Sequence, residues 1–439
     1  MNTEIEPMNS TQSLTRLGEG YFSGRFAARG IARLTLAGAL LSGAVVAQAA
    51  TVVPAPFRVN TYVSGDQSFP AAACNVLGNC VVAWQSDGED GSLLGIYAQR
   101  FNAAGARVGS EFRVNTFTTN KQFQPAVAIN ASGAFVIVWD SSGQDDAGVS
   151  VRGQLYAASG APMGSEFKVN TSTHDLSIRV GVGMDASGKF AVVWPEHFTS
   201  GGISFTKNSL IEMRRYNADG SAAGDPIDVA SSLDTLRSPE IAMDAAGDSV
   251  VVWESESHSA INSSPTGLGV GIRGREYGAD GKAKAVAFTA NSAVASKQVD
   301  QPVVAIDSAG NYVIAWEALD TGLNPLGVVA RRFPASGAAS AEFAVGAATQ
   351  LQHTPSIAMS PDGRFAIAGQ SDRIYLQTYS ATGVATGAVQ TLDTTTATNV
   401  ALLPTLTIGA SGAGFAAWQS MGGDGVGSRA VLARYFSLP

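Results

Sequence analysis

The sequence predicts an all-β protein, a seven-bladed β-propeller with four antiparallel strands in each blade. Six tryptophans end short apolar runs at spacings of 55, 55, 59, 63 and 102 residues, and the last spacing is two repeats long. The copy between Trp316 and Trp418 has Gly369 in the tryptophan position. The chain therefore contains seven copies of about fifty-five residues. Each copy contains four strand-like pieces, and a repeat of this kind is typical of a propeller blade.

The second copy shows the four pieces most clearly. They are Pro125 to Asn130, Ala134 to Asp140, Ser150 to Tyr156 and Glu166 to Thr171. Turns rich in Asn, Asp and Gly separate the first piece from the second and the third from the fourth, because these residues tolerate the left-handed backbone of a hairpin. The second piece is apolar on both faces, which suits a strand packed between two neighbouring sheets. A parallel β-helix is the rival fold, but it usually has shorter rungs and lacks two tight hairpins per repeat.

The order of the pieces at the two ends of the array predicts how the ring closes. Phe57 to Thr61 matches the fourth strand of a blade, whereas Leu432 to Phe436 matches a third strand. An unpaired edge on the last blade would leave a row of free backbone donors and acceptors. We therefore expect Phe57 to Thr61 to lie antiparallel to the strand that contains Arg434 and Tyr435, as the outer strand of the last blade.

Residues 1–49 have the pattern of an export signal, and residues 50–439 form the predicted propeller domain. Four arginines precede an apolar run from Leu34 to Ala47, and Ala47-Gln48-Ala49 fits the small-x-small cleavage pattern. The apolar run is shorter than the ~20 residues that span a bilayer, and the segment is longer than most signals, so a retained anchor is the alternative. We expect a secreted or periplasmic protein with no membrane span in the mature chain.

The composition argues against nucleic acid as a partner. The chain has 28 Lys and Arg against 36 Asp and Glu, a formal charge of −8. Phosphate contacts need a basic surface, and the sequence has no basic stripe.

The FxVNT, PxVAxD, FVVVW and GIxxQRF pieces resemble propeller-like repeats in secreted and surface proteins of bacteria. The best matches are Phe112 to Thr116, Pro125 to Asn130, Phe135 to Trp139 and Gly95 to Phe101. The resemblance covers nearly all of the predicted mature chain and implies the propeller fold. Some of these repeats belong to calcium-rich adhesin-type or toxin-type chains, but the nonapeptide calcium repeats that accompany them are absent here. The motifs are structural, so they imply little about activity.

Cys74 and Cys80 are the two cysteines of the chain. Aligned to the second copy, they fall on Ile129 and Phe135, which face each other across the first tight turn. In an exported protein two such cysteines typically form a disulfide, and we predict one here; two reduced, buried thiols are the alternative.

The segments that follow the tryptophan strands are acidic, and we expect them to emerge on one face of the disc, where loops on a rigid scaffold often bind ligands. Oxygen-rich loops could hold Ca²⁺, which takes six to eight oxygen ligands, although Asp and Gly also make ordinary soluble turns. The candidate calcium ligands are Asp87, Glu89, Asp90, Asp145 and Asp146. The candidate ligand-binding face comprises Asp87, Glu89, Asp90, Asp140, Asp145, Asp146, Glu196, Glu254, Glu256, Glu317 and Asp320.

The sequence contains no recognisable catalytic motif, so the catalytic residues stay unassigned at this point. We expect a non-catalytic binding module that uses the acidic face for a glycan, a cell-surface protein or a divalent cation. The alternative is a polysaccharide-acting hydrolase or lyase with its site in the central funnel, and a third reading is a structural unit whose activity belongs to a partner. The binder is favoured because the inner pieces, which read PAVAIN, PEIAMD, PVVAID and PSIAMS, are nearly free of acids.

Overall fold

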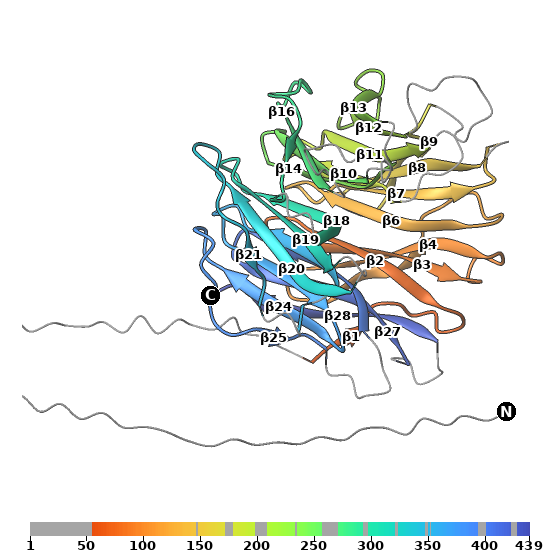
Figure 1. The fold of residues 1–439 in the computed structure, drawn as a ribbon. Helices are drawn as coiled ribbons and strands as arrows, with labels where there is room; N and C mark the ends of the chain where they lie inside the picture. The colour runs from red at the N-terminus through yellow and green to blue at the C-terminus, as the bar shows by residue number, and fades with distance from the viewer. Residues whose placement is uncertain are drawn as a thin grey trace, which may run out of the picture. The chain divides into compact units, whose positions relative to one another are not determined.

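The computed structural model describes residues 55–145, 148–171, 179–197, 209–232, 235–256, 271–292, 297–320, 324–346, 350–351, 353–393, 401–422 and 428–439. These residues form seven antiparallel sheets of four strands each, arranged as a propeller (Figure 1). The predicted fold class is therefore confirmed. The predicted leader, residues 1–49, lies outside the described residues and stays a prediction. In the described part of the chain, no helix is long and apolar enough to cross a bilayer.

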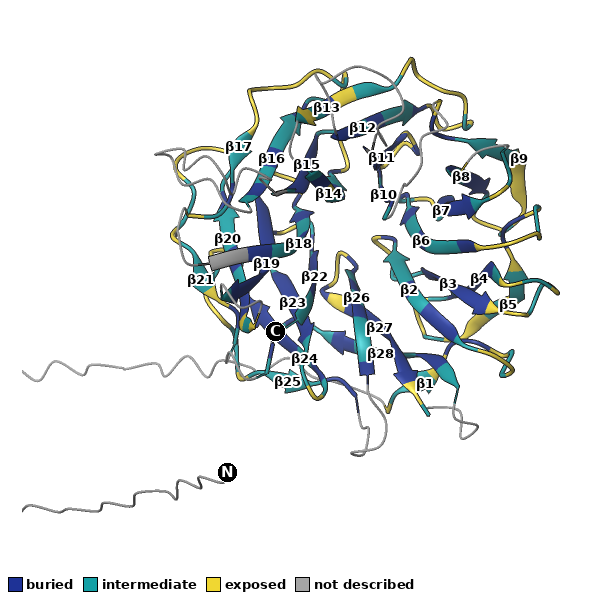
Figure 2. Cartoon of the chain, turned by 45° about the vertical axis from the view of Figure 1, so that its right-hand side comes forward, coloured by how far each residue is buried: buried dark blue, intermediate teal, exposed yellow. Residues whose placement is uncertain are grey.

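The first strand of each blade lies nearest the centre of the ring (Figure 2). Neighbouring first strands contact one another around the ring, so together they form the wall of the central channel. These inner strands are β2 (Gln67–Cys74), β6 (Gln122–Ile129), β10 (Gly181–Met184), β14 (Thr235–Met243), β18 (Lys297–Ile306), β22 (His353–Met359) and β26 (Ala401–Ile408).

The second strand of each blade is buried between two neighbouring blades. Val81 and Ala83 pack against the second blade, whereas Val82 and Trp84 pack against the seventh. Each of the seven apolar clusters formed by the described residues contains side chains of two adjacent blades. The apolar character of both faces is thus explained, because the hydrophobic core lies between blades. The second strands are β3 (Cys80–Asp87), β7 (Phe135–Ser142), β11 (Phe190–His197), β15 (Ser249–Glu256), β19 (Tyr312–Asp320), β23 (Phe365–Gln370) and β27 (Ala413–Met421).

The third strand of each blade is joined to a short outer strand at the rim. The Asn of the FxVNT piece makes this junction, because its side-chain oxygen accepts a backbone hydrogen bond from the third strand. Asn115 Oδ1 accepts from the N–H of Ile96 at 2.7 Å, and Asn170 Oδ1 accepts from that of Val151 at 2.9 Å. The third strands are β4 (Leu94–Phe101), β8 (Val149–Tyr156), β12 (Ser209–Tyr216), β16 (Gly271–Tyr277), β20 (Pro325–Phe333), β24 (Ile374–Tyr379) and β28 (Arg429–Ser437). The outer strands are β5 (Arg107–Arg113), β9 (Pro162–Lys168), β13 (Ile227–Ser232), β17 (Phe288–Thr289), β21 (Phe343–Ala344), β25 (Gln390–Thr391) and β1 (Phe57–Arg58).

The two ends of the array meet in the seventh blade, as predicted. Strand β1 pairs antiparallel with β28, where Phe57 stands opposite Ala433. The N–H of Val59 donates to the carbonyl of Val431 at 2.8 Å, and the N–H of Val431 donates to Asn60 Oδ1 at 2.9 Å. The first described strand therefore supplies the outer strand of the last blade and closes the ring.

Cys74 and Cys80 form a disulfide between β2 and β3, as predicted. The two residues are direct partners in the antiparallel register, and they flank the tight turn that begins at Asn75. The bond therefore links two strands of one blade and leaves the contacts between blades unchanged.

We expect Asn60→Ala to weaken the closure of the ring. The substitution leaves the buried N–H of Val431 without its acceptor, which costs about 1–3 kcal/mol. The melting temperature should fall, and amide hydrogen exchange should accelerate along β28.

Asn115→Ala is the matched control, because it removes the equivalent bond inside a blade whose four strands are consecutive in the chain. It should accelerate exchange in β4 but leave that of β28 unchanged. Unaltered exchange along β28 in Asn60→Ala would contradict a closing role for this contact.

We expect the double substitution of Cys74 and Cys80 by alanine to lower stability by roughly 2 kcal/mol, since the bond closes a short loop in the unfolded chain. The ring should still fold. The unaltered protein, measured in the presence of a reducing agent, should have nearly the same melting temperature as the variant. Mass mapping of exported protein that detects two free thiols would refute the disulfide.

Candidate functional site

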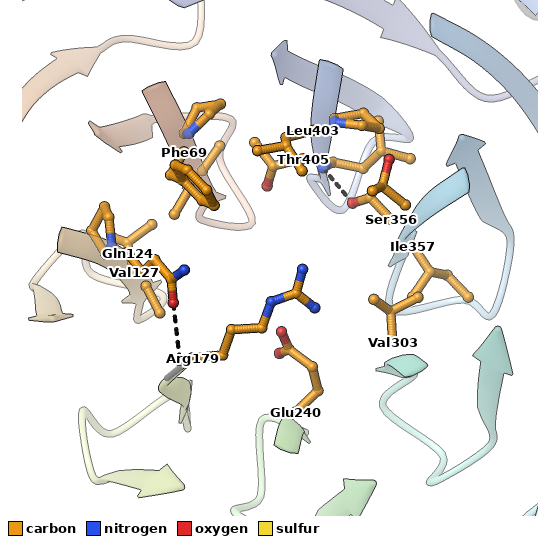
Figure 3. Close-up of a pocket in the computed structure, with 18 of the residues that line it drawn as sticks. Phe69, Gln124, Val127, Arg179, Glu240, Val303, Ser356, Ile357, Leu403 and Thr405 are labelled. Carbon is orange, nitrogen blue, oxygen red and sulfur yellow. Dashed lines mark hydrogen bonds between the residues drawn. The ribbon is translucent and has the colours of Figure 1, made fainter. Parts of the chain in front are cut away.

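The inner strands enclose a cavity of about 350 Å³ in the centre of the ring (Figure 3). Its described wall consists mainly of apolar side chains and neutral polar groups. The charged residues among those that line it are Arg179, which precedes β10, and Glu240 of β14. A largely apolar cavity with a few converging polar groups is the usual form of a ligand site.

Each blade has one residue with a left-handed backbone, which lies in the inner strand of six blades and just before β10 in the third. Such a conformation costs a residue other than glycine about 1–3 kcal/mol. In six blades the pairing of the inner strand with the second strand is interrupted by a β-bulge at this point. Because the conformation recurs in every blade, it belongs to the architecture, and what distinguishes one blade from another is the side chain. The seven residues are Phe69, Gln124, Arg179, Ser238, Gln301, Thr354 and Leu403.

A hydrogen bond from the preceding blade holds this left-handed residue in most of the ring. The acceptor is the side chain that follows the tryptophan position, so Gln85 Oε1 accepts from the N–H of Gln124 at 3.0 Å and Gln419 Oε1 from that of Phe69 at 3.2 Å. The same contact joins Asp140 to Arg179, Glu317 to Thr354 and Gln370 to Leu403. These bonds couple the buried second strand of one blade to the channel wall of the next.

Four of the acids assigned to the loop face are buried in second strands, and their placement in exposed loops is corrected. The exposed fraction is 0% for Asp140, 6% for Glu196, 5% for Glu254 and 4% for Glu317. Buried polar groups are normally hydrogen-bonded inside the protein. Asp140 and Glu317 accept backbone hydrogen bonds from the next blade, whereas Glu196 accepts from Trp194 of its own strand. The strand continues past the tryptophan by one or more residues, which the sequence pattern did not reveal.

The other acids of that face lie at or beyond the ends of the second strands. Asp87 is exposed, whereas Glu89 and Asp90 are half-buried. Asp145 forms ion pairs with Arg152 and Lys168. Asp320 accepts hydrogen bonds from Asn324, Asp146 lies outside the described residues, and the side chain of Glu256 is likewise not described.

Calcium binding at Asp87, Glu89, Asp90, Asp145 and Asp146 stays a prediction. Within the described ranges, no group of three or more His, Cys, Asp or Glu side chains is placed to hold a metal ion.

Arg179 and Glu240 come from adjacent blades and meet in the cavity. Figure 3 shows the guanidinium and the carboxylate pointing toward one another. Two amides fix the arginine: Gln124 Oε1 accepts from its backbone N–H at 3.0 Å, and Gln301 Oε1 accepts from Nη2 at 3.3 Å. Gly181 lets the two inner strands approach, because a Cβ at this position would lie 2.9 Å from Val193 Cγ2 and 3.4 Å from Glu240 Cα.

Burial raises the pKa of Glu240 to about 7, and the positive charge of Arg179 opposes the rise. A carboxyl group with a pKa near 7 is present in both protonation states at neutral pH, so it can donate or accept a proton. The side chain also keeps contact with the water of the channel. Geometry and pKa together make Glu240 the candidate for proton transfer.

Three further glutamates with raised pKa lie outside the cavity lining. Burial raises the pKa of Glu254 to about 9, and a hydrogen bond with Asp300 adds to the rise. Burial and the neighbouring Glu196 raise the pKa of Glu212 to about 8. Burial likewise raises the pKa of Glu89 to about 7. The folded protein favours the uncharged form of these three carboxyl groups. None of them lines the cavity, so we regard them as structural.

Sequence analysis missed both charged residues of the cavity. A comparison of equivalent positions among the repeats would have singled out Glu240. The position after the inner-strand proline is Ala71, Ala126, Val303, Ser356 or Thr405 in five copies and Glu240 in the fourth. Counting acids along whole strands obscured this one exception.

No protein-family model matches the chain, and no curated protein matches it. Several solved structures share the fold. A protein of unknown function from Dyadobacter fermentans is 11% identical with a TM-score of 0.51, and the match covers 89% of this chain and 99% of that one. An ulvan lyase of polysaccharide lyase family 25, bound to -[GlcA(1-4)Rha3S]-, is 11% identical with a TM-score of 0.51, and the match covers 87% and 96%. Identities this low establish the fold alone.

The expectation of a non-catalytic binder on the acidic loop face is wrong. The fold is shared with a polysaccharide-cleaving propeller, four of the proposed face residues are buried between blades, and the cavity contains a carboxyl group beside a guanidinium. The candidate site therefore lies in the central funnel, where the alternative expected it, and not on the loop face.

We expect the protein to lose stability as the pH rises from about 5 to about 9. Glu89, Glu212, Glu240 and Glu254 have folded-state pKa values of about 7 to 9, above the usual 4.5. Between these values the folded state binds more protons than the unfolded state, so raising the pH favours unfolding. Melting temperatures measured at pH 5, 7 and 9 should therefore decrease.

Glu212→Gln should reduce this pH dependence, because the amide does not titrate. A melting temperature that is constant or rises across the range would show that these carboxyl groups are not held neutral in the folded protein.

Proposed function

We propose that this protein cleaves a polysaccharide in the central cavity, with Glu240 as the proton-transfer group. The observation that carries the proposal is that Glu240 and Arg179 point toward one another in a cavity whose other described lining residues are uncharged. A carboxyl group with a pKa near 7 beside a fixed guanidinium is suited to proton transfer at a site where negative charge develops.

The remaining walls of the cavity are suited to a sugar. Phe69 and Leu403 form an apolar side opposite Arg179 (Figure 3), and Gln124, Gln301 and Thr354 supply polar groups for hydroxyls. A volume of about 350 Å³ is at the lower end of the range for small-molecule sites. The cavity would therefore hold the sugar units at the cleaved bond, and the rest of the polymer would extend along the channel.

Glu240, Arg179 and two glutamines of the cavity each have a role in the proposed reaction. Glu240 in its protonated form donates its proton to the oxygen of the leaving sugar as the C–O bond breaks. A water molecule then adds to the sugar carbon and returns a proton to the Glu240 carboxylate, so the step is a hydrolysis. Arg179 stabilises negative charge next to it, and Gln124 and Gln301 are positioning residues because they hold the arginine through its backbone and its side chain.

The solved ulvan lyase supports the proposal only at the level of architecture: a propeller of similar size is known with an acidic saccharide bound. The predicted export signal and the Cys74–Cys80 disulfide support a location outside the cytoplasm, where disulfides persist and where polysaccharides would be encountered. The resemblance of the repeats to those of secreted and surface proteins agrees with this location.

We expect purified protein to release shorter saccharides from at least one member of a panel that contains ulvan, pectin, alginate, chondroitin sulfate, xylan and arabinan. Glu240→Gln should reduce the rate by about 100-fold or more, the usual contribution of a general acid or base. Activity of the unaltered protein should fall as the pH rises through about 7, because Glu240 then loses the proton that it donates.

Glu89→Gln is the control, since it makes the same substitution at a carboxyl group of similar pKa outside the cavity lining. It should retain activity. Equal activity of Glu240→Gln, or no cleavage of any polysaccharide by the unaltered protein, would refute the proposed function.

A further inference from the structure

Arg179 lacks an ionic partner among the described residues. No described carboxylate lies within ion-pair distance of its guanidinium, and its side chain has one hydrogen bond, from Nη2 to Gln301 Oε1. A guanidinium has five N–H donors. Figure 3 shows the group standing in the cavity with Glu240 in front of it. Most of its hydrogen-bonding capacity is therefore directed into the cavity.

The fold does not require a charge at this position. The other six blades carry Phe69, Gln124, Ser238, Gln301, Thr354 and Leu403 at the equivalent left-handed residue. Two of them are glutamines, so an uncharged side chain of similar length is compatible with the same left-handed backbone. Placing a charge in a partly enclosed cavity is costly without compensation. Glu240 is only partly ionised at neutral pH because its pKa is about 7, so it does not fully balance this charge. Arginine at this position thus points to an anionic ligand.

We infer that the cavity selects a uronic acid unit and that Arg179 binds the carboxylate of that sugar. The inference rests on the proposed function and names its substrate class. A planar guanidinium can bind a carboxylate through two parallel hydrogen bonds, which fixes the orientation as well as supplying charge. The apolar side formed by Phe69 and Leu403 lies across the cavity, where it contacts the C–H face of the sugar ring.

Glu240 distinguishes a carboxylate from a sulfate ester, which is the other common anionic group on polysaccharides. The pKa of Glu240 is about 7, so the side chain is mostly protonated only below neutral pH. A protonated carboxyl group donates a strong hydrogen bond to a carboxylate. A sulfate ester is a much weaker base and accepts such a bond poorly, so the pair of residues fits the uronate better.

Binding measured by calorimetry on the unaltered protein tests this inference, with oligosaccharides whose glycosidic oxygen is replaced by sulfur so that they are not cleaved. The probes are oligosaccharides of galacturonate, glucuronate and mannuronate, each beside the same oligosaccharide with its carboxyl groups reduced to alcohols. At least one uronate should bind ten-fold or more tightly than its reduced form. The Arg179→Gln substitution should bring the two affinities to within about two-fold.

Arg179→Gln places at this position the residue that blades two and five carry, so the fold is preserved, and the melting temperature checks this. Arg113→Gln, on the exposed outer strand β5, is the charge-matched control and should leave the preference unchanged. Equal affinity for both forms, no binding of any uronate, or a preference for a sulfated neutral oligosaccharide would overturn the inference. Cleavage of a neutral polymer such as arabinan would also overturn it while leaving the proposed function intact.

Discussion

Burial of the second strand on both of its faces is the constraint on which the whole ring depends. Val81 and Ala83 face one neighbouring blade, and Val82 and Trp84 face the other. Each apolar cluster is therefore formed jointly by two adjacent blades. Apolar burial is the main favourable term in folding, and a blade with one neighbour would lose a large part of it. The array must therefore close, which explains why β1 crosses to pair with β28.

The same buried strands also shape the central cavity. The residue after the tryptophan position reaches into the next blade and accepts the N–H of the left-handed residue on its inner strand, as Gln85 does for Gln124. Packing between blades thus sets the bulge, and the bulge places a side chain in the channel wall. A rigid wall of this kind can hold a guanidinium in one orientation without help from loops.

The sequence pattern of the repeat is interrupted next to Arg179, one of the two charged residues of the cavity. In the third blade Pro195 follows the tryptophan and offers no acceptor, and Val180 replaces the proline found after the left-handed residue in the other six blades. Departures from a local rule concentrate at functional or strained sites. In this ring they coincide with Arg179 and Glu240, so the two charged cavity residues lie where the pattern of the repeat is interrupted.

The sequence alone determined the fold, the number of blades, the disulfide and the closing strand, because each depends on local signals: the Trp spacing, the turn residues and the phase of the two ends. It also contained Arg179 and Glu240, but periodicity cannot tell which side chains of an inner strand turn toward the axis. That depends on the left-handed backbone, which at Arg179 is held by a hydrogen bond from its N–H to Asp140, a residue far away in the chain. Likewise, Glu254 and Glu317 read as loop acids, and only the packing of adjacent blades shows that they are buried. Tertiary structure decided the site because burial and orientation are properties of the assembled ring.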